Sequence, residues 1–348
     1  MPEWQTADSF SFGIISGKAA AEILADVLPD TVAIVREAYL AQAEGRAHNP
    51  RSHFLRFDDR PTDRIIALAA DLGDESAVAG LKWISSWPEN VAAGIPRASA
   101  VLILNRRDTG YPFAVLEASL ISAVRTAASA VLAAESLISA VRPLSERARD
   151  LRIGFIGCGI IARNIYDMFR ARRWKFREVA AYDTDDGSAS AFLEHVEPGA
   201  ATLLARTQHE LIAGSDMVVF ATTAARPHVF DLKAFEHNPL ILHISLRDLS
   251  EQIILASNNI VDDVDHCLQA DTSPHLAEKL TGGRAFITGT ITDAMSGTVT
   301  IDPGRPTVFS PFGMGILDLA VGRFIYQEAR RRNLVVDIDD FFHEKHRW

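Results

Sequence analysis

The stretch from Leu151 to Asp186 constrains the fold more than any other part of the chain. An apolar run over residues 153–156 leads into the turn GCGIIA at residues 157–162. A helical pattern follows, and a second apolar run over residues 179–182 ends on Asp183. Strand, glycine turn, helix, strand and acid in this order match the dinucleotide-binding fingerprint in its G-x-G-x-x-A form. The stretch therefore predicts a Rossmann domain that binds a dinucleotide.

The small residues of this turn each have a physical role. Gly157 permits the tight turn, and Gly159 lets the backbone approach a pyrophosphate at the helix N-terminus. Ala162 is small enough for the helix to lie close to the strand. Ile160 and Ile161 open the helix and are expected to lie beside the cofactor. The alternative is a glycine turn in a strand–helix–strand unit that binds nothing.

Asp183 indicates which dinucleotide is bound. It follows the loop by about 20 residues, where a carboxylate can accept hydrogen bonds from both ribose hydroxyls. The same carboxylate would repel a 2′-phosphate, so the sequence favours NAD over NADP. Arg163 and Arg170 are the nearby cations that count against this preference.

Composition narrows the class of protein. A chain of 348 residues with 48% hydrophobic and 23% charged residues is expected to form two soluble globular domains. The net charge of −10 argues against a nucleic-acid-binding surface. Only two cysteines, Cys158 and Cys267, are present, which fits a reducing compartment, and we expect a cytoplasmic protein. Cys158 is expected to fill space in the glycine turn and not to act as a nucleophile.

No targeting or membrane segment is expected. Residues 1–17 lack a basic region followed by an apolar core, which a signal peptide would have. No run of 18 apolar residues is free of charge, so no membrane span is predicted.

The two ends of the chain are expected to form one domain. Residues 18–45 show helical periodicity, and several consecutive strands follow, with a hairpin turn at residues 108–110. Strands without intervening helices indicate a mostly antiparallel α+β domain. A long alanine-rich helix at residues 117–141 then leads to the glycine loop, and a final helix over residues 316–332 is expected to fold back onto the first domain. The predicted fold class is α/β, with a discontinuous α+β sheet domain at 1–128 plus 318–348 and a Rossmann domain at 129–317.

Three basic residues stand in apolar surroundings in the first domain. Lys82 lies between Leu81 and Trp83, Arg125 lies among small residues of the long helix, and Arg51 starts a strand. A charge in such a setting is costly unless it is paired, so each cation pairs with an acid of the fold, extends its charged end to the surface or binds an anionic ligand. Arg125 also falls at the expected domain junction, where dinucleotide enzymes often bind substrate.

Asp248 is the candidate acid–base residue of the second domain. It follows the apolar run LILHIS, and an acid at the carboxyl end of a parallel strand points into the ligand crevice. The alternative is an aspartate that caps a helix or turn. His243 within the run is expected to be a satisfied core histidine. The cluster Asp262, Asp263, Asp265 and His266 has the composition of a metal site, but nothing completes it, and no metal is expected.

Taken together, these segments resemble the ornithine cyclodeaminase/mu-crystallin family over nearly the whole chain. The resemblance rests on GLKWISSWPEN, on LILNRRDTGYPFAVLEASLISAVRTAASAVLAA, on IGFIGCGIIA, and on FSPFGMGILDLAVGRFIYQEA. The fuller strings, among them LHISLRDLSEQIILASNNIVDDVDH, look most like a branch that oxidises N-(2-amino-2-carboxyethyl)-L-glutamate. That branch supplies L-2,3-diaminopropionate for siderophores and peptide antibiotics.

The resemblance implies roles for particular residues. Arg51, Lys82 and Arg125 match positions that hold the substrate carboxylate or work beside it, and Asp248 matches the catalytic aspartate. Lys82 is also a catalytic candidate, since it can steer water or the carboxylate. We further expect cofactor contacts from Thr126, Thr222 and Ser310. Where the family typically has a HINAVG-type run, this chain has HISLRD, which speaks against ornithine cyclisation.

The resemblance also implies the reaction and the assembly. The expected activity is NAD-dependent oxidation of a secondary amine, followed by hydrolysis to L-2,3-diaminopropionate and 2-oxoglutarate. The expected substrate carries three carboxylates, so Arg97 and Arg247 are added as substrate-binding candidates. Members of the family are typically homodimers joined through the sheet domain. The alternatives are ornithine cyclodeaminase, ketimine reductase or alanine dehydrogenase activity on the same scaffold, or a mu-crystallin-like binding protein without turnover.

Overall fold

The chain divides into two compact units in the computed structural model, which describes residues 10–73, 77–141 and 151–344. The first unit comprises Met1–Arg125 and Met314–Trp348, and the second comprises Thr126–Gly313. The first nine residues, where no signal peptide is expected, and the last four of the charged tail lie outside the described residues. The observed boundaries, like the expected ones at 128 and 317, fall in the long alanine-rich helix and at the start of the last helix.

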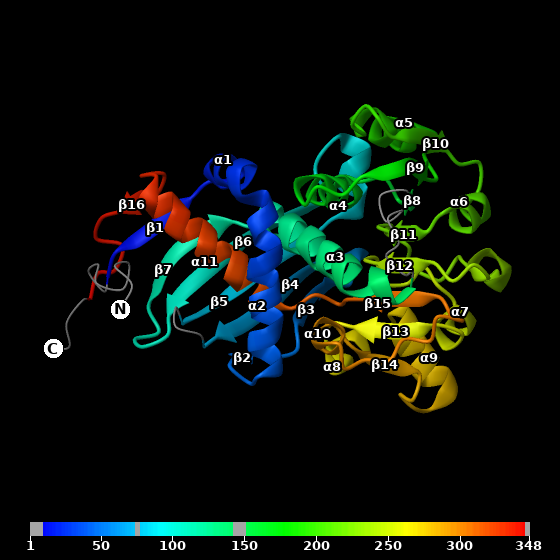
Figure 1. The fold of residues 1–348 in the computed structure, drawn as a ribbon. Coiled ribbons are helices and arrows are strands. Elements are labelled where there is room, and N and C mark those ends of the chain that lie inside the picture. The colour runs from blue at the N-terminus through cyan, green and yellow to red at the C-terminus, as the bar shows by residue number, and fades with distance from the viewer. Residues whose placement is uncertain (1–9, 74–76, 142–150, 345–348) are drawn as a thin grey trace. The chain divides into compact units, whose positions relative to one another are not determined.

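The first unit is built on an eight-stranded mixed sheet (Figure 1). Its order is β16 (Val336–Ile338), β1 (Phe12–Ile15), β7 (Pro112–Glu117), β6 (Ala98–Arg106), β5 (Val78–Ser86), β4 (Arg60–Leu72) and β2 (Ala47–His48), and β3 (His53–Phe57) also pairs with β4. Every pairing is antiparallel except that of β1 with β7. The prediction of a mostly antiparallel sheet is confirmed, although β1 and β16 were not predicted.

Helices cover one face of this sheet. They are α1 (Gly17–Val27), α2 (Thr31–Ala43) and α11 (Gly315–Arg331), with the short 3₁₀ turn η2 (Leu28–Asp30) between α1 and α2; another 3₁₀ turn, η3 (Pro88–Ala93), follows β5. The break expected at Pro29-Asp30 separates α1 from α2. The last helix, α11, packs against α1, α2 and strands β4 to β6, as its apolar pattern predicted. Because side chains of a strand alternate, β5 turns Lys82 toward these helices and Trp83 away from them.

The long helix α3 (Ser119–Val141) contains the boundary between the units. Its segment Ser119–Ser139 is long and apolar enough to cross a membrane, but 72% of that apolar window is buried inside the protein. Burial of this kind is typical of a core helix. A single helix of this length and composition is weak evidence for a membrane span.

The second unit is built on an eight-stranded sheet in which every pair is parallel. Its order is β10 (Ala201–Leu204), β9 (Phe176–Tyr182), β8 (Leu151–Ile156), β11 (Met217–Phe220), β12 (Leu240–His243), β15 (Thr307–Ser310), β13 (Asn258–Val261) and β14 (Ile287–Thr290). The direction of strand order reverses between β8 and β11, which is where open α/β sheets bind ligands. The predicted Rossmann architecture is confirmed.

Helices of the second unit follow its strands in the βα alternation that a parallel sheet requires. They are α4 (Ile160–Ala171), α5 (Asp186–His195), α6 (Gln208–Gly214), α7 (Glu251–Leu255), α8 (Val264–Cys267), α9 (Ser273–Thr281) and α10 (Ile291–Ser296), with the 3₁₀ turn η4 (Leu232–Phe235). Strands β11, β12, β13 and β15 are buried along their whole length, as strands covered on both faces should be.

Candidate functional site

Gly157 turns the chain between β8 and α4 with a φ of +85°. A Cβ atom at this position would lie 2.7 Å from the carbonyl oxygen of Ala221 and 2.9 Å from the backbone nitrogen of Thr222. Both the backbone angle and the close approach of the next strand therefore require glycine. The glycine loop is pressed against the carboxyl end of β11.

In contrast to that beside Gly157, the space beside Gly159 is free. A Cβ added there would meet no atom within 4 Å, and Gly159 caps α4 without any side-chain hydrogen bond. The first backbone N–H groups of α4 therefore face free space, as a pyrophosphate site needs. The neighbouring Ile160 is 66% exposed, whereas Ala162 is fully buried against the sheet. The loop thus fits the dinucleotide for which its sequence is typical.

Asp183 closes the other side of this loop from the end of β9. Its Oδ2 accepts a hydrogen bond of 2.7 Å from the backbone N–H of Cys158, and its Oδ1 accepts one of 3.1 Å from that of Asp185. Burial, together with the charge of Asp183, raises the pKa of the Cys158 thiol to about 12. A thiol in that state is no nucleophile near neutral pH, in agreement with the filler role predicted for Cys158.

Asp248 is the centre of a buried polar network just after β12. Its Oδ1 accepts hydrogen bonds from Thr222 and from His228 Nε2, at 3.0 Å, and its Oδ2 contacts His243 Nε2 at 3.1 Å and Ser245 Oγ at 2.5 Å. The carboxylate has no exposed surface. Thr222, an expected cofactor contact, thus links Asp248 to the strand end on which the glycine loop rests.

The ionisation of Asp248 follows from these contacts. Burial raises the pKa of its carboxyl, but the hydrogen bonds from His228, His243 and Ser245 outweigh burial and hold the pKa well below its usual range. The contacts therefore favour the ionised form of Asp248 near neutral pH. Within the network, His228 is the titratable partner with access to solvent, since 29% of its side chain is exposed.

Three other residues of the second unit have partners of their own. His243 is buried, and its Nδ1 contacts Ser310 Oγ at 3.1 Å, so it is the satisfied core histidine that was predicted. Ser310, an expected cofactor contact, is itself 5% exposed. The Arg247 guanidinium donates to the backbone carbonyls of Ala270 and Asp271, at 2.6 and 3.0 Å. Substrate contact by Arg247 stays a prediction.

Lys82 and Arg125 meet on one acid, Asp318, in the first unit. Lys82 Nζ lies 2.7 Å from Asp318 Oδ2, and Arg125 Nε lies 3.2 Å from Oδ1. Lys82 also donates to Ser122 Oγ at 3.0 Å. The side chains of Lys82 and Asp318 are 2% and 0% exposed, and that of Arg125 is 12% exposed. The structure therefore brings together two of the three cations that the sequence singled out.

Burial sets the ionisation of Lys82. Loss of water lowers the pKa of its ammonium, Asp318 raises it, and Arg125 lowers it again, with a net pKa of about 8. The charge of Lys82 therefore changes with pH near the physiological range, unlike that of an ordinary lysine.

Two further predicted residues, Arg51 and Thr126, are not members of this ion-paired set. Arg51 is exposed in the segment before β3 and forms no ion pair with any residue that the structure describes. Thr126 follows Arg125 on α3 and is half-buried. Roles for Arg51 and Thr126 stay predictions.

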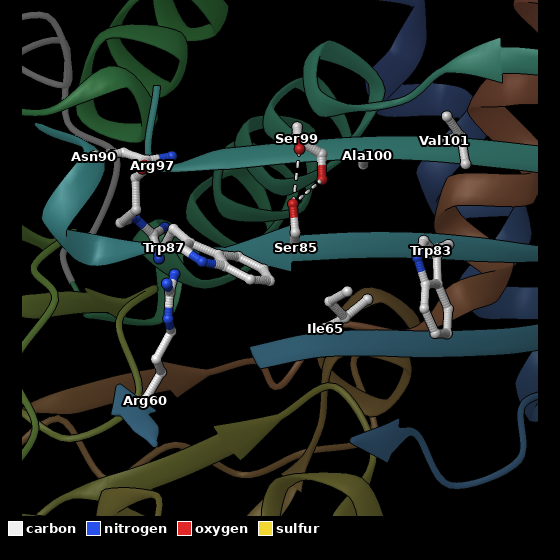
Figure 2. A pocket seen from close by; sticks show the side chains of 10 residues that line it. All are labelled: Arg60, Ile65, Trp83, Ser85, Trp87, Asn90, Arg97, Ser99, Ala100 and Val101. Atoms are coloured by element: carbon white, nitrogen blue, oxygen red, sulfur yellow. Dashed lines mark hydrogen bonds between the residues drawn. The ribbon is translucent and has the colours of Figure 1, made fainter. Parts of the chain in front are cut away.

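Arg97 lies beside a pocket on the opposite face of the sheet from Lys82. Figure 2 shows this hollow of about 660 Å³, with Arg97, Arg60 and Trp87 at one end and Trp83 and Val101 at the other. Arg97 donates to Ser86 Oγ at 2.9 Å, and its burial lowers the pKa of its guanidinium. Substrate contact by Arg97 stays a prediction.

The acidic residues after β13, Asp262, Asp263 and Asp265, have structural partners within the second unit. Asp262 accepts the backbone N–H groups of Phe312 and Gly313, at 3.0 and 2.7 Å. Asp263 caps α8 and contacts His266, while Asp265 pairs with Arg284 at 2.8 Å. In the described ranges, no group of three or more His, Cys, Asp or Glu side chains is arranged so that it could hold a metal ion.

Asp318 and His228 are among the residues of the site that were not predicted. Asp318 stands in GILDLAVG, where an acid inside an apolar helical pattern gives a signal, because such an acid needs a buried partner. His228 stands in the loop segment RPH and gives no comparable signal. Its role depends on a contact with Asp248 across 20 residues.

Comparisons with known proteins agree with this architecture. The model of the ornithine cyclodeaminase/mu-crystallin family matches residues 15–333. The N-((2S)-2-amino-2-carboxyethyl)-L-glutamate dehydrogenase of Staphylococcus aureus is 30% identical over 311 residues, which is 86% of this chain and 89% of the relative.

Two solved structures share the fold. The Δ1-pyrroline-2-carboxylate reductase of Thermococcus litoralis, in complex with NADH and L-proline, has a TM-score of 0.83 at 21% identity, covering 94% of this chain and all of the other. An archaeal alanine dehydrogenase dimer with bound NAD has a TM-score of 0.81 at 26% identity, covering 96% of this chain and all of the other.

Proposed function

Because the chain belongs to the ornithine cyclodeaminase/mu-crystallin family, we propose that it is an NAD-dependent oxidoreductase acting on the CH–NH bond of an amino-acid substrate. The glycine loop of the second unit and the paired cations Lys82 and Arg125 of the first supply the two binding functions that such an enzyme needs.

The proposed substrate is N-(2-amino-2-carboxyethyl)-L-glutamate. The observation that carries this choice is the similarity to the Staphylococcus aureus enzyme, which extends over most of both chains. The proposed products are L-2,3-diaminopropionate and 2-oxoglutarate. We place the reaction in the cytoplasm, in the biosynthesis of a siderophore or peptide natural product.

The cofactor is held by the second unit in this proposal. The backbone at Gly157, Gly159, Ile160 and Ile161 receives the pyrophosphate, and Asp183 accepts the ribose hydroxyls. Thr126, Thr222 and Ser310 complete the proposed contacts. Bound NAD supplies the hydride acceptor for the α-carbon of the glutamate portion.

The substrate carboxylates are held by cations. Lys82 is buried, Arg125 is partly exposed, and both are ion-paired and retain N–H donors beyond those that face Asp318 and Ser122. They are proposed to bind one carboxylate. Arg51, Arg97 and Arg247 are the proposed partners for the others.

Proton transfer is the proposed task of the Asp248 network. The secondary amine must be neutral before its C–H bond breaks, because its lone pair forms the C=N bond. Asp248 is enclosed, so we propose that it orients and stabilises His228 through Nε2 and that His228 takes up the proton at Nδ1, which lies 2.9 Å from Gln208 Oε1. Water then adds to the imine carbon, and the C–N bond breaks to release the amine and the keto acid.

The proposed assembly is a homodimer joined through the sheet of the first unit. The face turned away from the helices carries exposed apolar side chains along paired strands: Val336, Ile14, Trp83, Val101 and Leu55, each 40–60% exposed. Exposed apolar side chains gathered on one face are typical of a protein interface.

The test is product formation by the purified protein. It is mixed with NAD and the synthetic glutamate adduct, absorbance of NADH is followed, and both products are identified by mass spectrometry. L-alanine, L-ornithine and L-proline, with NAD, serve as the comparison panel. We expect NADH, 2-oxoglutarate and L-2,3-diaminopropionate from the adduct, at a kcat/KM well above that for any panel member.

Other outcomes point to the alternatives. Turnover of a panel amino acid in place of the adduct would assign the chain to another reaction on the same scaffold. Tight NADH binding without turnover of any compound would favour a mu-crystallin-like binding protein.

A further inference from the structure

Asp318 is placed to hold two cations at once. It lies in the first turn of α11, where the partial positive charge of the helix N-terminus stabilises a carboxylate. Its two oxygens are divided between the cations: Oδ2 contacts Lys82 of β5 and Oδ1 contacts Arg125 of α3. Ser122, one helical turn before Arg125, accepts hydrogen bonds from both, at 3.0 Å from Lys82 Nζ and 3.5 Å from Arg125 Nη2.

The charges of this cluster do not cancel. Two cations face one carboxylate, and Ser122 is neutral. The residues paired with Lys82 on the adjacent strands are Leu68 of β4 and Leu102 of β6, which carry no charge. Asp318 of α11 and Arg125 of α3 are thus the charged groups that face Lys82. One positive charge is left in surroundings where an unpaired charge is unfavourable.

Hydrogen-bond donors are also left over. The Lys82 ammonium has three N–H groups; one is donated to Ser122 Oγ, and the ion pair with Asp318 Oδ2 at 2.7 Å occupies at most one more. The Arg125 guanidinium has five N–H groups. The N–H on Nε is donated to Asp318, and one N–H on Nη2 is donated to Ser122. The described residues leave the remaining donors for a ligand.

We propose that Asp318 is a positioning residue: it fixes Lys82 and Arg125 as one site whose single excess positive charge matches a single carboxylate. This deepens the proposed function, on which it rests for the identity of the carboxylate. The match follows from the shared acid. The carboxylate of Asp318 offsets the repulsion between Lys82 and Arg125. Because it offsets only one of their two charges, one positive charge is left for a ligand.

Asp318 should control the protonation of Lys82. A lysine whose pKa is lower in the folded than in the unfolded state makes stability rise with pH between the two values. For Lys82 that interval runs from about 8 to the ordinary 10.5. Without the carboxylate of Asp318, which raises the pKa of Lys82, the rise should begin at a lower pH.

The experiment measures unfolding by urea from pH 6 to pH 9.5, without substrate or cofactor. Wild type is compared with Lys82→Met, and Asp318→Asn with Asp318→Asn/Lys82→Met, so that each difference isolates Lys82. In the first pair, the unfolding equilibrium constants should diverge above pH 8 by about tenfold per pH unit. In the second pair, the divergence should begin at least one pH unit lower.

A purely structural Asp318 would lower stability equally at every pH and leave the onset at pH 8, which would overturn the proposal. If Asp318→Asn does not fold, Arg125→Met decides. Removing the cation that competes for Asp318 should move the onset above pH 8, and an unchanged onset overturns the proposal. Because no turnover is measured, failure here is distinct from failure of the proposed reaction.

Discussion

Lys82 and Trp83 are neighbours in β5 but belong to opposite faces of the same sheet. Lys82 is 2% exposed and bound to Asp318, whereas Trp83 is 40% exposed on the uncovered face. The strand alternation separates the proposed ligand site from the proposed dimer surface by one residue. Substitutions at the two positions should therefore have separable effects.

Substrate affinity should depend on pH through Lys82. Only the protonated ammonium attracts a carboxylate, and its pKa is about 8. In wild type, KM should be constant below pH 7 and rise up to about tenfold per pH unit above pH 8. Steady-state kinetics between pH 6.5 and 9.5 measure this, with the substrate that supports turnover.

Two variants isolate the contribution of Lys82. Lys82→Met should raise KM by about 10- to 100-fold at pH 7, the range expected for a lost charge-assisted hydrogen bond, and remove the rise at high pH. Lys82→Arg keeps a charge that does not titrate in this range, so its KM should also lack the rise. The same alkaline rise in both variants would show that another group causes it.

The exposed sheet face should mediate self-association. The double variant Trp83→Glu/Val101→Glu places two charges on it, at positions 40% exposed in the single chain, so folding should tolerate them. Light scattering should report twice the 38.1 kDa chain mass for wild type and the single mass for the variant. Leu280→Glu, at a 60% exposed apolar position of the second unit, is the control and should remain dimeric. A dimeric double variant would place the interface elsewhere.

Asp248 and His228 should be needed for turnover but not for cofactor binding. Asp248→Asn keeps the shape and removes the charge that orients His228, and His228→Gln removes the ring. Each should lower kcat by about 100-fold or more, while NADH titrations stay near wild type. His237→Gln is a matched control, since the His237 ring bonds the Ser215 carbonyl at 2.8 Å. Near-wild-type turnover in Asp248→Asn would remove Asp248 from the mechanism.

Asp183 should determine the preference for NAD. Asp183→Ala removes an acceptor for the ribose hydroxyls and the charge that repels a 2′-phosphate, so NADH binding should weaken by about 10- to 100-fold. NADPH binding should weaken less or improve, since Arg163 has no ion pair with a described residue, whereas Arg170 is paired with Glu197 at 3.1 Å. Fluorescence titration with both nucleotides measures the ratio, and an unchanged ratio would contradict the prediction.

Local patterns made much of the fold predictable. The glycine turn, the following helix and the strand ending on Asp183 are encoded within 36 residues, and the structure has all three. The final helix was predicted to pack on the first unit because its apolar positions repeat at helical spacing. Strands β1 and β16 were missed because each is short and is completed by the other from the far end of the chain.

The candidate site was predictable only in part, because its contacts are long-range. Lys82 and Arg125 were found as cations in apolar sequence, but their shared acid lies 193 residues after Arg125. Asp248 was found from its strand end, yet its enclosure depends on His228 and Thr222 from another segment. Sequence spacing gives residue types and strand ends, and only the packed chain shows which side chains satisfy one another.

Substitutions at the two glycines of the loop should be removed by selection for different reasons, protein stability at Gly157 and nucleotide binding at Gly159. At Gly157, any side chain would strike the chain's own backbone, so variants should be lost before the protein accumulates in a cell. At Gly159, the space is empty, so variants should accumulate as folded protein and fail only when a nucleotide is needed. In a mutational library sorted first for abundance and then for activity, Gly157 variants should disappear at the first step and Gly159 variants at the second.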